Sequence, residues 1–248
     1  MGLKDEVDVY DKAKVSIDTG EIEDYDAVVF PNVIRRREIE LIKSELQAVK
    51  TKRILDFGCG GGWLSRVLAS YDCEVVGIDV SRSLISSAKR IAPLANFIVG
   101  DGMHLPFREG VFDAVVSIAT LHHLDVKKGL KEVRRVLKNR CMFILMEPNK
   151  LNPLSAISRK LFPMETHTIG EEPFIPTQLG SHLELQGFKI KSTRYLFFFS
   201  FPLARMLKLL NSSSITHFLV HIVDAVERTF EHLPVLNSLN STIVVLAE

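Results

Sequence analysis

The sequence predicts an α/β fold whose parallel sheet binds a ligand at the carboxyl ends of its strands. Between residues 50 and 150, short apolar segments alternate with segments of helical period, and short strands that cross over through a helix pair in parallel. Residues 54–64, ILDFGCGGGWL, have the pattern of a buried strand end, a glycine turn and the start of a helix. The 248 residues, 46% of them hydrophobic, suffice for one such domain with a large core and an insertion or cap.

Residues 1–49 are expected to form an N-terminal arm and a helix. Residues 1–29 are rich in Asp, Glu and Lys and keep no sustained period, which indicates a loosely folded arm. After Pro31, apolar residues recur at a helical period as far as Val49. This pattern predicts a leading helix that packs on the sheet.

Residues 50–149 are expected to form the ligand-binding core, with five strands. The strands are predicted to end at residue 55 and to cover residues 74–78, 96–99, 112–117 and 141–146. Ser81 is a candidate cap for a helix that Pro93 ends, and Asp125 is a candidate cap for a helix that runs to Leu137.

From Glu147 the alternation stops, and prolines break residues 150–175 into loops with short helices. We expect this segment and residues 196–236 to form helical cap insertions over the carboxyl ends of the strands, with Glu147 and Asn149 overhanging the cleft. A helix that Gly187 stops, a sixth strand at 188–195, a helix at 215–230 and a final strand within 237–248, beside the sixth, complete a single domain of residues 1–248.

The glycine turn suits a nucleotide-like ligand, because its main chain can be approached closely. A dinucleotide site would have glycines at the first, third and sixth positions, whereas Gly58, Gly60 and Gly62 fall at the first, third and fifth, and the sixth is Trp63. Asp79 follows the second strand, where a carboxylate can accept two hydrogen bonds from a ribose diol. The alternative for this carboxylate is an interaction with the dipole of the next helix.

Asp101 and Gly102 follow the third strand, where a carboxylate could hold an exocyclic amine. The alternative is an ordinary turn, which an Asp-Gly pair favours.

Four stretches that contain these residues resemble, in chain order, the motifs of the class I S-adenosylmethionine-dependent methyltransferases. They are residues 54–62 (ILDFGCGGG), 76–81 (VGIDVS), 100–107 (GDGMHLPF) and 112–124 (FDAVVSIATLHHL). The ordered set most resembles the small-molecule branch, type 11, that includes the quinone-biosynthesis methyltransferases, and it covers residues 50–150.

The resemblance implies a Rossmann-like, doubly wound sheet of seven strands, mostly parallel with an antiparallel last strand. It implies S-adenosylmethionine as cofactor and S-adenosylhomocysteine as product. By position, it assigns the methionyl part to Asp56, Gly58, Cys59, Gly60 and Gly62, with Ser117 and Ile118 along the methionyl chain, the ribose to Asp79, and the adenine to Val80, Asp101, Gly102 and Met103.

The predicted function is methyl transfer to a small, partly apolar molecule. His122 is the candidate catalytic base, because an imidazole can accept a proton near neutral pH and the His122–His123 pair follows the fourth strand. Packing and capping at a helix entry are the alternative for this pair. His217 and His221 lack the glutamate of a metalloprotease motif, so no metal site is predicted.

Two other functions remain open at this point. A NAD(P)-dependent oxidoreductase would share the sheet and Asp79, although Trp63 disrupts its fingerprint. A non-catalytic protein that binds S-adenosylmethionine would keep the same glycines.

The composition narrows the partners and the location. A formal net charge of +1 offers no general attraction to phosphates and disfavours nucleic acid as substrate. The three cysteines form no C-x-x-C pair, which favours reduced thiols and a cytoplasmic protein. The most apolar later stretch, residues 196–210, is interrupted by charges, so we expect core, a substrate pocket or contact with a membrane surface, and no span. The oligomeric state is not predicted.

Overall fold

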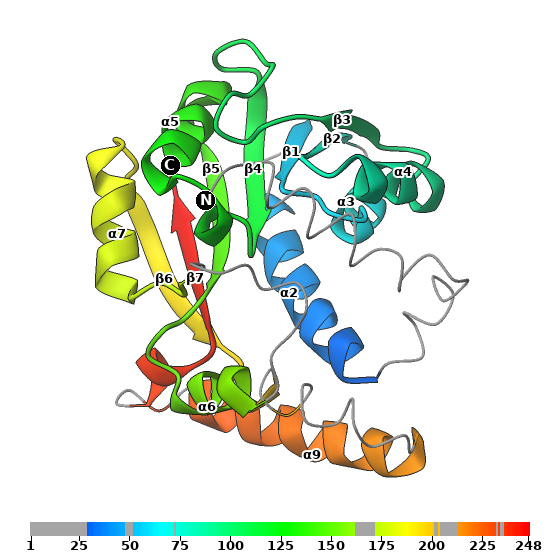
Figure 1. The fold of residues 1–248 in the computed structure, drawn as a ribbon, viewed down its shortest axis with the longest axis vertical. Coiled ribbons are helices and arrows are strands. Elements are labelled where there is room, and N and C mark those ends of the chain that lie inside the picture. The colour runs from blue at the N-terminus through cyan, green and yellow to red at the C-terminus, as the bar shows by residue number, and fades with distance from the viewer. Residues whose placement is uncertain are drawn as a thin grey trace.

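The computed structural model describes the backbone of residues 29–47, 52–71, 73–161, 172–200, 203, 213–231, 233 and 236–248, with side chains from residue 34 in the first range and from residue 222 in the range 213–231. The expected arm, and parts of both expected cap insertions, lie outside these residues. The described strands form one sheet of seven, in the order β3-β2-β1-β4-β5-β7-β6 (Figure 1).

The described elements follow one another along the chain as α2 (Val29–Gln47), β1 (Arg53–Phe57), α3 (Trp63–Leu68), β2 (Glu74–Asp79), α4 (Arg82–Ile91), β3 (Asn96–Val99), β4 (Phe112–Ile118), η3 (Leu121–His123), α5 (Val126–Val136), β5 (Leu137–Pro148), α6 (Pro153–Leu161), α7 (Pro176–Leu185), β6 (Ile190–Leu196), α9 (Ser213–Glu231), η4 (Asn237–Leu239) and β7 (Thr242–Ala247). Ser81 and Asp125 cap α4 and α5 through their side chains, as predicted.

The pairing of β1 places the ligand cleft. β1 pairs in parallel with β2 on one side and with β4 on the other, so the strand order reverses between β1 and β4. Of the described strands, only β7 runs antiparallel to its neighbours, β5 and β6, which confirms the predicted mostly parallel sheet with an antiparallel last strand. In open α/β sheets, ligands bind outside the carboxyl ends of the strands at such a reversal.

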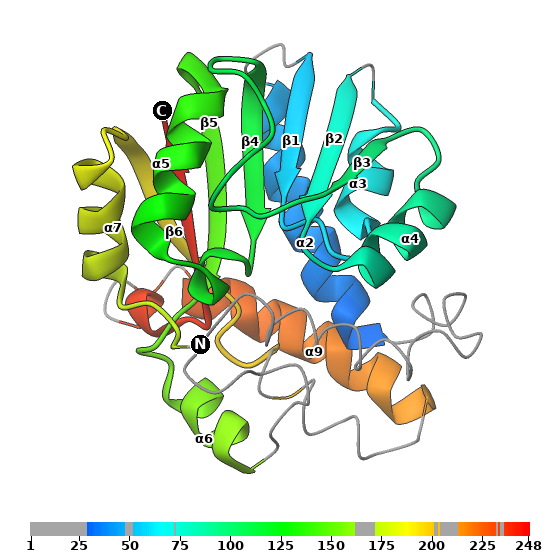
Figure 2. The same ribbon diagram turned by 45° about the horizontal axis from the view of Figure 1, so that its top comes forward.

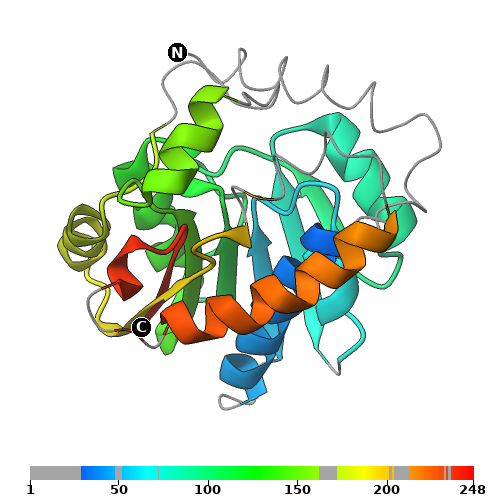
Figure 3. The same ribbon diagram turned by 90° about the horizontal axis from the view of Figure 1, so that it is seen from below.

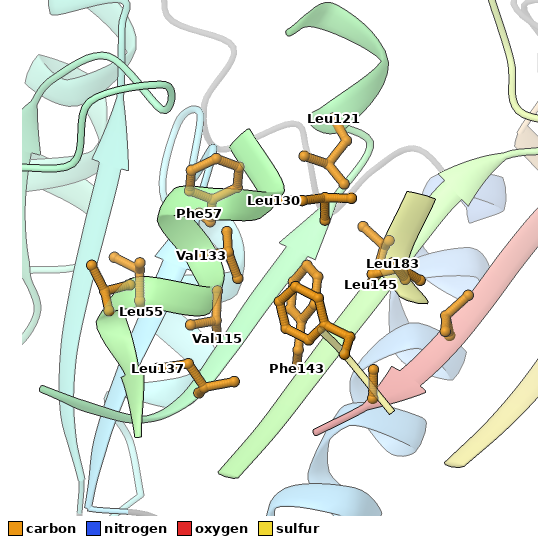
Figure 4. Close-up of a cluster of buried hydrophobic side chains, with 14 of the residues drawn as sticks. Leu55, Phe57, Val115, Leu121, Leu130, Val133, Leu137, Phe143, Leu145 and Leu183 are labelled. Carbon is orange, nitrogen blue, oxygen red and sulfur yellow. The ribbon is translucent and has the colours of Figure 1, made fainter. Parts of the chain in front are cut away.

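Helices cover both faces of the sheet (Figure 2). On one face, α5 and α7 bury Leu130, Val133 and Leu183 against alternate strand residues such as Leu55 and Phe143 (Figure 4). On the other face, α2 and α3 pack with the intervening strand residues, because successive side chains of a strand point to opposite faces.

The fifth strand begins earlier than the sequence predicts, and the helix before it ends one residue earlier. Leu137, expected as the last residue of a helix, has extended backbone angles (φ −77°, ψ 133°) and pairs with Phe112 of β4. The register shifts between Phe112 and Ala114, so β5 makes an irregular start before its apolar part. Residues 138–140 are polar, so the apolar pattern by which the sequence analysis located strands does not include the start of β5.

Buried asparagines fasten the chain after β5 to the chain before β7. Asn149 Nδ2 donates to the carbonyls of Ser238 and Asn240, at 2.9 and 2.7 Å. Asn152 Nδ2 donates to the carbonyl of Leu239 at 2.7 Å. Both asparagines are fully buried, so these bonds are shielded from water and fix the start of α6.

Helix α9 lies across the end of the molecule that carries α6, against α2 (Figure 3). Glu227 of α9 is fully buried and accepts hydrogen bonds from the amides of Phe198, Phe199 and Ser200, at 2.5, 2.8 and 2.6 Å. Burial raises the pKa of this carboxyl group. Arg37 of α2 forms an ion pair with Glu231, so buried hydrogen bonds and an ion pair hold α9 in place.

Two buried carboxyl groups make the stability of the fold depend on pH. Burial raises the pKa of Glu38 on α2 to about 7, with a smaller opposing effect of Arg35. Burial likewise raises the pKa of Asp56 to about 7. Because the folded state holds both protons more tightly than the unfolded state, unfolding free energy falls as the pH rises from about 4 to about 7.

We expect Glu38→Gln to stabilise the protein by about 2–3 kcal/mol at pH 8 and to change little at pH 4.5. The amide of the variant cannot ionise, so its unfolding free energy depends less steeply on pH than that of the wild type. Urea unfolding at a series of pH values measures this. Glu40→Gln is the matched control, since Glu40 is exposed on the same helix beside Arg36. A slope that is the same in Glu38→Gln and in the wild type would contradict the expectation.

Candidate functional site

A cavity of about 220 Å³ lies at the carboxyl ends of β1, β2, β3 and β4, where the strand order reverses. Its walls come from the turn after β1, the end of β2, the first turns of α4, the loop after β3 and the turn after β4. The residues that line the cavity are Phe57, Gly58, Gly60, Ile78, Asp79, Val80, Leu84, Gly100, Gly102, Ala119, Thr120, His123 and Leu124.

A wider hollow of about 410 Å³ lies beside the end of α5, away from the strand ends. Its lining includes Arg135, whose guanidinium already bonds Glu132 and the carbonyls of Leu105 and Phe107. The cavity at the glycine turn is therefore the candidate site.

The glycine turn exposes main chain to the cavity. Gly60 has a φ of +49°, and a Cβ placed there would meet nothing within 4 Å. Gly58 has a φ of +74° and packs so tightly that a Cβ would lie 2.1 Å from Thr120 Oγ1. Gly58 thus lets the turn pack on the end of β4, while Gly60 leaves its backbone open to a ligand.

Asp79 ties the glycine turn to the start of α4. Its Oδ2 accepts a hydrogen bond from the amide of Gly60 at 2.9 Å, and its Oδ1 accepts one from the amide of Ser81 at 2.9 Å. Each carboxylate oxygen has a second lone pair, so Asp79 can also accept bonds from hydroxyl groups in the cavity. Val80 and Leu84 add apolar walls next to it.

Asp101 and Met103 stand beside this lining, although Gly102 between them belongs to it. Asp101 Oδ1 accepts a bond from the amide of Met103 at 2.8 Å, and its Oδ2 lies 3.0 Å from Nδ1 of His104. The predicted turn is therefore present, and the Asp101 side chain lies outside the cavity lining.

Two predicted residues of the glycine turn are turned away from the cavity lining. Asp56 is buried on the α3 side, where its Oδ2 accepts a bond from Ser65 Oγ at 2.6 Å. Cys59 is 4% exposed and packs with Ala88 and Phe97. Burial raises the pKa of its thiol well above the usual range, so Cys59 is no thiolate nucleophile.

Three other predicted residues, Gly62, Ser117 and Ile118, lie outside the cavity lining and pack behind it. Gly62 abuts Ala88 of α4, and Ile118 packs against the α2 face of the sheet. Ser117 is fully buried, and its Oγ bonds none of the residues that the structure describes.

His123, rather than His122, reaches the cavity wall. The centroids of the two rings are 3.9 Å apart, and their planes are tilted by 39°. His122 Nδ1 lies 2.7 Å from Oε2 of Glu147, at the end of β5. His217 and His221 belong to the part of α9 whose side chains the structure leaves undescribed.

Glu147 and Thr120 shape the site. The sequence analysis expected Glu147 to overhang the cleft but gave it no partner, and it missed Thr120. Glu147 Oε1 accepts hydrogen bonds from the amides of Thr120 and Leu121, at 3.0 and 2.7 Å. Thr120 Oγ1 donates to the carbonyls of Ile118 and Phe57, at 3.1 and 3.2 Å, which joins the ends of β4 and β1. A sequence signal exists only for Glu147, which ends an apolar strand just before a proline.

These features define an α/β protein with a cavity at a glycine turn and a strand reversal. Residues 55–145 match a family model described as a methyltransferase domain. An uncharacterized methyltransferase of Synechocystis sp. is 35% identical over 147 residues, which cover 56% of this chain and 68% of that protein. The chain belongs to this methyltransferase family.

Two further similarities concern function and fold. A demethylmenaquinone methyltransferase of Thermotoga maritima is 33% identical over 116 residues, 46% of this chain and 49% of that protein. The crystal structure of the [4+2]-cyclase SpnF superposes with a TM-score of 0.60 at 20% identity, and covers 86% of this chain and 80% of that one. The second similarity supports the fold alone.

The family identifies the protein as an S-adenosylmethionine-dependent methyltransferase. It decides against the oxidoreductase that the sequence analysis left open. Among the described helices, none combines the length and apolar character that crossing a bilayer requires.

Proposed function

We propose that the cavity at the glycine turn binds S-adenosylmethionine and that the methyl acceptor, a small and partly apolar molecule, meets it beside His123. The observation that carries this proposal is the convergence of the open Gly60 main chain, the Asp79 carboxylate and the apolar Val80 and Leu84 on one cavity. A cytoplasmic location, which the reduced cysteines favour, belongs to the same proposal.

The residues present fit this cofactor. Asp79 would hold the ribose hydroxyls, the turn from Gly58 to Gly60 would hold the methionyl part, and Val80 and Leu84 would flank the adenine with Asp101 and Met103 at its edge. Asp56, Cys59, Gly62, Ser117 and Ile118, also predicted from the resemblance, would act by shaping the turn and the strand end behind it.

The bound cofactor supplies a methyl group already activated on a sulfonium. The protein therefore mainly has to orient the acceptor and exclude water, which are effects of several kcal/mol. For an acceptor that must lose a proton, His123 is the candidate base at the cavity wall. We assign His122 to positioning His123, because its own ring is held by Glu147.

The acceptor assay tests the whole proposal. The protein is incubated with methyl-labelled S-adenosylmethionine and a small-molecule extract of cells, and labelled products are separated. Transfer of label to a small molecule is expected. A thermal shift with S-adenosylhomocysteine but no labelled product from any extract would favour the non-catalytic alternative.

We expect Asp79→Ala to weaken the binding of S-adenosylhomocysteine at least tenfold, because charge-assisted bonds contribute about 1.5–3 kcal/mol each. Isothermal titration calorimetry measures this. Asp79 also holds the amides of Gly60 and Ser81, so Asp113→Ala is the matched control. Asp113 accepts bonds from the amides of Lys52 and Arg53 at the far end of the sheet. Unchanged affinity in Asp79→Ala would remove the ribose assignment.

A further inference from the structure

Helix α6 presents its apolar residues to solvent. Ile157 is 55% exposed and Leu161 is 63% exposed, and Leu151, just before the helix, is 42% exposed. Ser155 and Ser158, in contrast, are each only 5% exposed. A surface helix of a globular protein normally has the opposite arrangement, with its apolar stripe against the core.

Polar contacts hold α6 in this orientation. Ser155 Oγ lies 2.9 Å from Ser241 Oγ, and the amide of Ser155 donates to Asn152 Oδ1 at 2.5 Å. Asn152 is itself bonded to the carbonyls of Leu239 and Phe198, at 2.7 and 3.1 Å. Rotation of α6 to bury Ile157 would break these buried hydrogen bonds. They therefore fix the orientation in which the apolar residues of α6 face solvent.

The outward apolar residues share one side of the helix, and the exposed Lys160 flanks them. Ile157 and Leu161 are four residues apart, so they lie on the same side of the helix. Residues 150–161 contain Lys150, Arg159 and Lys160 and no acidic residue. Lys150 forms an ion pair with Glu172, which leaves Arg159 and Lys160 as the cations of the helix itself.

We propose that α6 docks on a lipid surface with anionic headgroups, with Ile157 and Leu161 inserted between the lipids and Lys160 among the headgroups. Apolar side chains on one side of a helix with flanking cations are the features by which interfacial helices bind such surfaces. The formal net charge of the whole chain is +1, so the attraction has to come from this local patch.

Helix α6 lies at the end of the sheet where the proposed substrate site is, so docking there would have a function. The helix begins a few residues after β5 ends, beyond the carboxyl ends of the strands (Figures 1 and 2). The cavity lies at the carboxyl ends of β1 to β4. A partly apolar molecule dissolved in the lipid would then leave it at the edge of the sheet where the cavity lies. The docking itself does not depend on the proposed function, since it requires neither cofactor nor acceptor.

Co-sedimentation of the full chain with vesicles tests the proposal. We expect binding to vesicles of phosphatidylcholine mixed with phosphatidylglycerol, weaker binding at high salt, and little binding to phosphatidylcholine alone. The double variant Ile157→Ser, Leu161→Ser is expected to reduce the partition coefficient at least tenfold, because both inserted side chains are lost. Lys160→Glu is expected to reduce it about fivefold on the anionic vesicles alone.

Exposed leucines elsewhere provide matched controls. Leu94 is 78% exposed and Leu185 is 75% exposed, on other parts of the surface, so Leu94→Ser and Leu185→Ser should bind vesicles like the wild type. Thermal unfolding and S-adenosylhomocysteine binding show that each variant is folded. Absence of wild-type binding to the anionic vesicles, or an equal loss in the controls, overturns the proposal. Light scattering that shows a lipid-free dimer, lost in the double variant, would identify the face as a contact between copies and overturn it as well.

Discussion

Replacing Glu147 with alanine is expected to lower the free energy of unfolding by about 4 kcal/mol. The side chain is almost completely buried, and its two oxygens accept hydrogen bonds from the amides of Thr120 and Leu121 and from Nδ1 of His122. Alanine leaves these three donors in a dry environment without their acceptor. Urea unfolding followed by circular dichroism measures the loss.

The same change should weaken S-adenosylhomocysteine binding, because Thr120 and His123 belong to the cavity wall. Glu147→Gln, which keeps one acceptor oxygen, is expected to lose less stability than Glu147→Ala. Glu132→Ala is the matched control, since Glu132 accepts a bond from the amide of Leu105 and pairs with Arg135 nearer to solvent. An equal loss of unfolding free energy in Glu147→Ala and Glu132→Ala would contradict the prediction, because the buried hydrogen bonds of Glu147 would then contribute no more than the more exposed ones of Glu132.

The sequence predicted the fold well where a pattern is local. Strands β2 and β3 were predicted within one residue, because apolar runs bounded by turn residues have few other interpretations. The start of β5 was missed, since Leu137 leaves the helix to pair with Phe112 and only the neighbouring strand determines that choice. Pairing partners are tertiary information, which a single segment does not carry.

The site was predicted in part, for a related reason. Gly58, Gly60, Asp79 and Val80 lie at or just after the ends of β1 and β2, so their place at the cavity follows from the alternation of strands and helices. Asp56 lies one residue before the end of β1, where the strand's side chains alternate, and it points to the α3 side.

The contact between His122 and Glu147 could not be predicted from spacing. The two residues are 25 positions apart and meet only because β4 and β5 are neighbours in the sheet. Carboxyl ends of adjacent parallel strands meet at one edge, but the sequence does not state which strands are adjacent.

Replacing Gly58 with alanine is expected to weaken S-adenosylhomocysteine binding at least a hundredfold, a loss of about 3 kcal/mol. The added Cβ would lie 2.1 Å from Oγ1, 2.3 Å from Cγ2 and 2.7 Å from Cβ of Thr120. A threonine is too short to swing away, so the glycine turn and the end of β4 must separate. This separation takes apart the cavity that both segments line. Isothermal titration calorimetry gives the affinity, and thermal unfolding shows whether the variant is folded.

Two comparisons separate the collision from the strain of a positive φ. Gly110 has a φ of +61° with nothing within 4 Å of an added Cβ, and it lies away from the cavity, so Gly110→Ala should lose only the roughly 1 kcal/mol of a left-handed alanine and no affinity. Thr120→Gly removes all three clashing atoms, so adding it to Gly58→Ala should restore much of the binding. If the double variant binds no better than Gly58→Ala, the collision with Thr120 is not the cause. The contact between the glycine turn and the end of β4 would then be irrelevant to the shape of the cofactor site.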